Sequence, residues 1–164
     1  MIRVNHAGEY GAKRIYAGQL AVLRGKKCEA TIKHMAEQED VHLEEFNKMI
    51  AERKVRPTAL IPLWHVAGYL LGAGSALLGE KAAMACTVAV EEVIDEHYKG
   101  QLDELKSDKK EKKLHDKIKK FRDEEIEHRN IGLKNEAEAA PGYELLTGAI
   151  KKISRTAIWL STRV

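Results

Sequence analysis

The sequence has little of what strands and frequent turns require. Among 164 residues there are only three prolines, and aromatic residues make up 5%. No stretch of useful length alternates apolar and polar residues as a half-buried strand does. Alanine, leucine, glutamate and lysine dominate instead, and these residues favour helices. The sequence therefore predicts an all-α protein, and its length fits a single domain, residues 1–164, that buries a core of its own.

A large net charge and a cysteine framework are also lacking. The formal net charge of +3 is too small to indicate a nucleic-acid-binding protein, and the lysine-rich part at 106–120 has no aromatic residues for base stacking. That part could suit an anionic membrane surface, but a solvated loop and helix face is the simpler interpretation. Cys28 and Cys86 form no CxxC motif, so we expect reduced thiols in a reducing compartment. No signal peptide or transit sequence is recognisable, which leaves open whether a segment precedes the first motif.

Helical periodicity can be followed through most of the chain. It predicts helices at about 5–25, 29–53, 80–106, 111–134 and 142–163. The apolar segment at about 57–79 includes twenty residues, 60–79, without a formally charged side chain, which is the length of a membrane span. A proline, a histidine and four glycines within it favour a buried crossover or an interfacial helix instead.

Two of the expected helices carry a glutamate and a histidine inside an apolar stripe. Glu39 and His42 fall on the apolar face of the helix at 29–53, and Glu125 and His128 continue the apolar face of a later helix. A step of three residues places both side chains on one side of a helix. Two Glu-x-x-His pairs are a weak signal in a chain with seven histidines. Their position on apolar faces makes them informative.

Two further helices each carry one solitary glutamate on the apolar face. These residues are Glu9 and Glu91, and each precedes a Glu-x-x-His pair by thirty to thirty-four residues. The chain therefore has two halves of similar plan. The alternative for Glu9 is an ordinary ion pair with Lys13, one helical turn away.

Four carboxylates can meet in a core only if they are protonated, paired with cations or bound to metal, because burying an unpaired charge is costly. Lysine and arginine are nearly absent from the four stripes. Two divalent ions would balance four carboxylates, and one glutamate from each of two helices plus Glu-x-x-His from two others is the dinuclear plan of four-helix bundles. Mixed oxygen and nitrogen ligation suits iron, manganese or zinc. The predicted ligands are Glu9, Glu39, His42, Glu91, Glu125 and His128. A lone membrane span at 60–79 would separate the two halves of this site, which further favours a crossover.

His97 and Tyr98 follow Glu91 on or beside the same face. They are candidates for hydrogen-bonding a metal ligand or for relaying electrons. An ordinary structural hydrogen bond explains them equally well.

Four blocks of sequence are distinctive. They are HAGEYGAKRIYAGQ (6–19), RPTALIPLW (56–64), GAGSALLGEKAAMACTVAVEEVIDEHY (72–98) and FRDEEIEHRNIGL (121–133). These blocks closely resemble the demethoxyubiquinone hydroxylases, the di-iron monooxygenases of ubiquinone biosynthesis. The resemblance implies a ferritin-like bundle with an additional C-terminal helix, in which the same six residues bind two irons and Glu39 and Glu125 bridge them. It also implies the penultimate step of ubiquinone synthesis, in which O2 hydroxylates the ring of a demethoxyubiquinol with electrons from NADH.

The resemblance further implies a peripheral membrane protein, on the cytoplasmic face of a bacterial inner membrane or the matrix face of the mitochondrial inner membrane. The crossover and TAIWLS (156–161) would face the lipid and admit the polyprenyl quinol. Arg163 matches an arginine of animal members and is a candidate NADH contact. Asn5, Glu96 and Trp159 depart from residues common in other members. The implied partners are other ubiquinone-biosynthesis proteins, including a lipid-binding one, and a second copy of the chain.

Two other functions remain open at this stage. A ferritin-like iron store or peroxide scavenger would use the same ligands, although it should not need a long uncharged crossover. A non-catalytic helical module that docks on a membrane or on other proteins would need no metal, and its glutamates would be paired.

Overall fold

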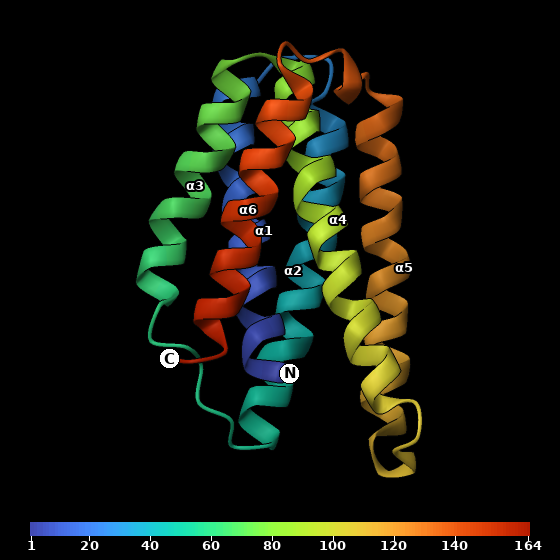
Figure 1. Ribbon diagram of the computed structural model, residues 1–164. Helices are drawn as coiled ribbons and strands as arrows, with labels where there is room; N and C mark the ends of the chain where they lie inside the picture. The colour runs from blue at the N-terminus through green and yellow to red at the C-terminus, as the bar shows by residue number, and fades with distance from the viewer.

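The protein consists of six α-helices and contains no strand (Figure 1). The structure is a computed structural model that describes residues 1–164. The helices are α1 (Ile2–Leu23), α2 (Glu29–Glu52), α3 (Ile61–Leu77), α4 (Glu80–Leu105), α5 (Lys112–Lys134) and α6 (Tyr143–Ser161), with 3-10 turns at Lys109–Glu111 and Ala137–Ala139. The prediction of an all-α fold is confirmed, and the helix ends lie within about three residues of those expected from periodicity.

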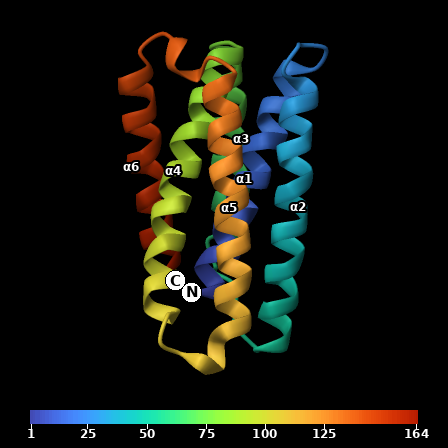
Figure 2. The same ribbon diagram turned by 90° about the vertical axis from the view of Figure 1, so that its right-hand side faces the viewer.

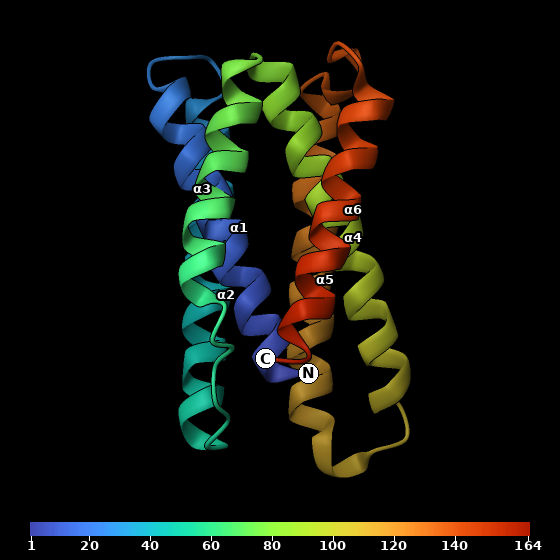
Figure 3. The ribbon, with the colours of Figure 1, turned by 60° about the vertical axis from the view of Figure 1, so that its left-hand side comes forward.

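The helices fall into two halves with the same plan, as the sequence predicts. In the first half α1 packs against α2 and α3, and in the second half α4 packs against α5 and α6. Figure 3 shows the first three helices on one side of the molecule and the last three on the other. In Figure 2, α5 runs along the bundle between α4 and α2. The inner helices α1, α2, α5 and α4 form the four-helix bundle, and α3 and α6 lie on its outside.

The crossover helix α3 lies very close to α1 because glycines line the contact. A Cβ atom on Gly72 would lie 1.9 Å from the backbone oxygen of Ile15, and one on Gly18 would lie 2.2 Å from the backbone oxygen of Tyr69. Only a hydrogen fits at these two positions. The crossover prediction holds for one face of α3, whereas its opposite face is exposed. No helix has both the length and the apolar character needed to cross a membrane.

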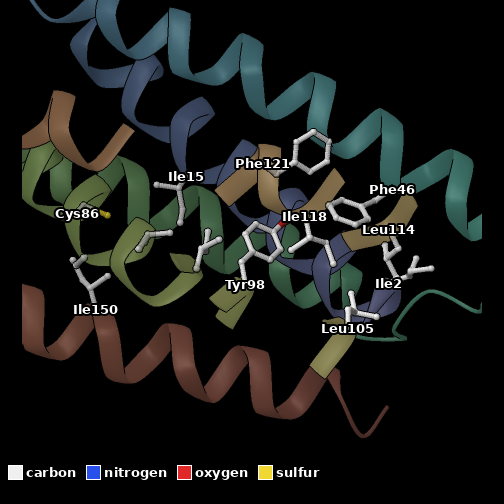
Figure 4. Packing of buried hydrophobic residues seen from close by; sticks show 13 residues of the cluster. Ile2, Ile15, Phe46, Cys86, Tyr98, Leu105, Leu114, Ile118, Phe121 and Ile150 are labelled. Carbon is white, nitrogen blue, oxygen red and sulfur yellow. The ribbon is translucent and has the colours of Figure 1, made fainter. Parts of the chain in front are cut away.

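The apolar core joins the two halves around large side chains of the inner helices. Figure 4 shows Phe46 of α2 facing Phe121 and Ile118 of α5, with Tyr98 of α4 beside them. The rings of Phe46 and Phe121 lie 5.6 Å apart at an angle of 66°. Both cysteines are buried and form no disulfide, as expected. This packing excludes water around the centre of the bundle.

Candidate metal centre

The six predicted ligand side chains meet inside the four-helix bundle. They are Glu9 of α1, Glu39 and His42 of α2, Glu91 of α4, and Glu125 and His128 of α5. None of them is more than 1% exposed. Their candidate ligand atoms form two groups, each with all atoms within 4.8 Å of one another: Glu9, Glu39, His42 and Glu125 in one, and Glu39, Glu91, Glu125 and His128 in the other. Glu39 and Glu125 belong to both groups, so they stand where bridging ligands would.

Both histidines turn the same ring nitrogen, Nδ1, towards the carboxylates. His42 Nδ1 lies 3.4 Å from Oε2 of Glu9 and 3.1 Å from Oε1 of Glu125. His128 Nδ1 lies 3.2 Å from Oε1 of Glu39 and 3.2 Å from Oε2 of Glu125. The two halves of the site are therefore built alike, with one imidazole in each.

Many of the buried polar atoms at this place have no hydrogen-bond partner. They include both carboxylate oxygens of Glu39 and Glu125, the Oε2 atoms of Glu9 and Glu91, and the Nδ1 atoms of His42 and His128. Orphaned buried acceptors are rare because each loses its interactions with water. Their number, convergence and chemistry fit two cations. Glu39 and Glu125, the shared glutamates, have both oxygens available, and Glu9 and Glu91, the outer glutamates, have one oxygen each.

The electrostatics of the four buried carboxylates also fit bound cations. Burial, and next the neighbouring Glu125 carboxylate, raise the pKa of Glu39 and of Glu91 well above the usual value for glutamate. The alternative ion pair between Glu9 and Lys13 is wrong, because Lys13 Nζ instead lies 2.5 Å from Asp40 on α2. No lysine or arginine forms an ion pair with any of the four buried glutamates.

Two tyrosines occupy the remaining oxygens of the outer glutamates. The hydroxyl of Tyr16 on α1 donates a 2.7 Å hydrogen bond to Oε1 of Glu91 on α4. The hydroxyl of Tyr98 on α4 donates to Oε1 of Glu9 on α1. Each tyrosine follows the glutamate of its own helix by seven residues. Sequence reasoning selected Tyr98 and missed Tyr16, although this shared spacing was a usable signal.

The outward nitrogens of the histidines also have protein partners. His42 Nε2 lies 2.8 Å from Oε2 of Glu124, and His128 Nε2 lies 2.9 Å from Oε1 of Gln38. Acceptors at these positions hold each imidazole with its proton on Nε2, which leaves Nδ1 available as a ligand atom. Sequence reasoning missed both residues because they lie beside the apolar stripes rather than in them.

His97 lies next to this site without reaching a predicted ligand. Its Nε2 lies 3.1 Å from Oδ1 of Asn5 and 2.8 Å from Nε2 of Gln101. Burial lowers the pKa of His97 to about 4, so the ring is neutral at neutral pH. The amide of Asn5 also exchanges two hydrogen bonds with that of Gln101. Asn5 is therefore part of a buried polar cluster between α1 and α4.

Arg163 lies away from the buried cluster, just after the end of α6. Its guanidinium group sits 4.3 Å from the centre of the Trp159 ring, and both side chains are exposed. The structure therefore does not bring this candidate NADH contact together with the six predicted ligands.

An apolar cavity of about 280 Å³ lies between α1, α3, α4 and α6, and none of the six predicted ligands lines it. Gly8 and Val90, the residues directly before Glu9 and Glu91, are among its lining residues. Leu71 of α3 and Ala157 of α6 line it from the opposite side. The lining is mostly apolar, which suits a hydrocarbon chain better than a polar ligand.

Known proteins are similar to this chain over almost its whole length. Residues 1–161 match the family described as "Ubiquinone biosynthesis protein COQ7". A Rhodospirillum rubrum protein named 3-demethoxyubiquinol 3-hydroxylase is 57% identical over 164 residues, which cover 99% of this chain and 76% of that protein. A human protein named NADPH-dependent 3-demethoxyubiquinone 3-hydroxylase, mitochondrial, is 54% identical, with 100% and 76% covered. A Saccharomyces cerevisiae protein named 5-demethoxyubiquinone hydroxylase, mitochondrial, is 42% identical, with 100% and 77% covered.

Proposed function

The chain belongs to the COQ7 family of ubiquinone biosynthesis proteins, and we propose that it hydroxylates the ring of a demethoxyubiquinol in the penultimate step of that pathway. Relatives that match this chain over nearly all of its length carry that activity in their names. The observation that carries the proposal is the pair of atom groups that share Glu39 and Glu125. A hydroxylase that uses O2 needs a bound metal or organic redox cofactor, because the protein's own side chains do not activate O2.

Two iron ions are the proposed occupants, each held by one outer glutamate, one histidine Nδ1 and the two shared glutamates. When bound, the iron pair supplies the electrons and the Lewis acidity that O2 activation requires. The reaction inserts one oxygen atom into a ring C–H bond and reduces the other to water, so it consumes two electrons and two protons. The human relative's name specifies NADPH, whereas the sequence resemblance implies NADH. We therefore propose a reduced nicotinamide nucleotide as the electron source.

The protein's own residues orient the ligands and keep water out. Tyr16 and Tyr98 each donate to one oxygen of an outer glutamate and leave the other oxygen without a protein partner. Glu124 and Gln38 hold the two imidazoles with Nδ1 directed inwards. The Phe121 ring lies 4.1 Å from the His42 ring and covers this side of the site. The ligand groups are thus held in place before any metal arrives.

The apolar cavity is the proposed site for the quinol and the first part of its polyprenyl tail. It lies beside the helix segments that carry Glu9 and Glu91, and α3 and α6 form its outer wall. Its apolar lining favours burial of hydrocarbon. A quinol ring held there would lie next to the metal centre, while the tail extends towards the surface.

The exposed face of α3 is the proposed contact with a membrane surface. It presents a stripe of apolar residues at helical spacing, each at least 51% exposed: Leu63, Val66, Leu70 and Leu77. Ile153 and Trp159 of α6 are exposed as well. Residues 67, 68 and 71 of α3 line the cavity, so the stripe and the cavity lie on adjoining faces of one helix. Peripheral attachment here, on the cytoplasmic or matrix face of an inner membrane, would let a lipid-tailed quinol enter directly.

The competing functions have less support. A non-catalytic module with paired glutamates does not account for the orphaned oxygens of Glu39 and Glu125. An iron store or peroxide scavenger would use the same ligands, but the names of the relatives favour the hydroxylase. Other ubiquinone-biosynthesis proteins, a lipid-binding protein among them, and a second copy of the chain are proposed as partners.

The proposal is tested by loading the purified chain with Fe²⁺ and supplying a demethoxyubiquinol analogue, 18O-labelled O2, and NADH or NADPH. We expect two irons per chain and a hydroxylated ring that carries one labelled oxygen atom. Glu39→Ala should lose both irons and the product. Peroxide consumption without ring hydroxylation would favour a scavenger, and a chain that binds no metal would favour the non-catalytic module.

A further inference from the structure

The residues that hold the two histidines from outside are equivalent in position and different in charge. Gln38 directly precedes the shared glutamate of α2, and Glu124 directly precedes the shared glutamate of α5. Each contacts the histidine of the opposite helix: Glu124 Oε2 lies 2.8 Å from Nε2 of His42, and Gln38 Oε1 lies 2.9 Å from Nε2 of His128. One imidazole therefore donates to a carboxylate and the other to a neutral amide.

Most of the other ligand contacts are matched between the halves, although His42 Nδ1 lies 3.4 Å from Glu9 and His128 Nδ1 lies 4.0 Å from Glu91. Each histidine turns Nδ1 inwards, each outer glutamate accepts from a tyrosine, and both positions share the same two carboxylates. The aromatic neighbours do differ, since Phe121 covers the His42 ring and Tyr16 meets the His128 ring edge-on. Among groups that hydrogen-bond to a ligand, the difference between Glu124 and Gln38 is the one that changes charge.

The Glu124 carboxylate is held in place from two sides. Its Oε2 accepts from His42, and its Oε1 lies 3.3 Å from Nζ of Lys120 one turn earlier on α5. Its side chain is 24% exposed, so Lys120 and solvent reduce its charge effect without removing it. A carboxylate that accepts the outer N–H of an imidazole strengthens the other nitrogen as a metal ligand, and an amide does so less because it is neutral.

We propose that Glu124 and Gln38 are positioning residues that make the two metal positions unequal. The position formed with Glu9 and His42 (the His42 position) binds its ion more tightly and fills first. The position formed with Glu91 and His128 (the His128 position) fills second and empties first. This inference rests on the proposed dinuclear site and adds an order of occupancy that the ligand set alone does not contain.

The test is a titration of the metal-free full chain with Co²⁺. Binding is measured by calorimetry and by the visible absorption of bound Co²⁺. We expect two binding steps whose affinities differ by about tenfold or more. Glu124→Gln should weaken the first step about tenfold and bring the two steps together. Gln38→Glu should tighten the second step and also reduce their separation. Glu127→Gln, an exposed change on the same helix, is the matched control and should alter neither step.

The exchange variant that combines Gln38→Glu with Glu124→Gln gives the decisive result. It keeps the same groups in total, so a merely structural role predicts no reversal. We expect two separated steps in reversed order: His42→Ala removes the tighter step in the natural background and the weaker step in the exchanged one. Equal Co²⁺ affinities for the two steps in the natural chain would overturn this inference. So would an order of the steps that stays the same in the exchange variant. Failure to bind Co²⁺ at all would instead overturn the proposed metal centre.

Discussion

Tyr16 of α1 donates a 2.7 Å hydrogen bond to Glu91 of α4 and so ties the two halves of the bundle together at the metal centre. The bond occupies Oε1 of the carboxylate and leaves Oε2 without a protein partner. Tyr98 makes the reciprocal bond from α4 to Glu9 of α1. Each tyrosine therefore fixes one oxygen of an outer glutamate and helps to orient its carboxylate at the centre.

Tyr16→Phe should weaken metal binding without unfolding the protein. Phe keeps the ring that packs in the core but releases Glu91, and losing such an oriented ligand typically costs about ten- to a hundredfold in metal affinity. The measurement is Co²⁺ affinity, with circular dichroism as the check on folding. Tyr10→Phe is the matched control, because Tyr10 lies on the same helix and its hydroxyl contacts His65 instead. Equal losses in both variants would contradict a role for Tyr16 at the site.

Glu39→Gln should change stability in opposite directions with and without metal. In the metal-free protein the change removes one of four converging buried carboxylates, so we expect the free energy of unfolding to rise by about 1–3 kcal/mol. With metal present, the variant should lose the stabilisation that bound ions give the natural chain. Urea unfolding with chelator and with Co²⁺ measures both effects.

Glu37→Gln, on the exposed face of the same helix, is the control for that experiment and should shift neither value by more than about 0.5 kcal/mol. If Glu39→Gln instead destabilised the metal-free protein, the Glu39 carboxylate would have its hydrogen-bond partners within the core and would not be a metal ligand.

Two glycines on α3 should respond very differently to alanine. Gly72→Ala places a methyl group 1.9 Å from the backbone oxygen of Ile15, which forces α1 and α3 apart, and should cost about 2–4 kcal/mol. Gly74→Ala meets no atom within 4 Å and should be neutral or stabilising by up to about 1 kcal/mol. Denaturant unfolding of both variants is the measurement. Similar stabilities would mean that the two helices do not pack this closely.

The exposed stripe on α3 should be required for binding to lipid. Val66 and Leu70 are 54% and 62% exposed, so changing both to glutamate should leave the fold intact and reduce flotation with anionic phospholipid vesicles by roughly tenfold or more. Leu71 is left unchanged because it packs against the core and lines the cavity. Val41→Glu, at a site on α2 that is 52% exposed, is the control. Unchanged flotation of the double variant would place the lipid contact elsewhere.

The helices and the six convergent side chains could be predicted from the sequence because their signals are local. An apolar stripe repeats with the helical period, and a residue on that stripe faces the core whatever the neighbouring helix is. The burial of Glu39 and His42 can therefore be predicted from their own positions on the stripe. The two-half plan is visible in the same way, because each solitary glutamate precedes its Glu-x-x-His pair by a similar interval.

Contacts between helices could not be predicted in this way. Lys13 is one turn from Glu9, and only the placement of α2 beside α1 shows that it pairs with Asp40 instead. Gln38 and Glu124 look like ordinary surface residues until α2 and α5 are packed together. The sequence by itself determined which side chains enter the core, since periodicity along a helix depends on that helix alone. Only the tertiary structure decided which groups they meet there, because each hydrogen bond depends on the rotation and spacing of two helices that are distant in the chain.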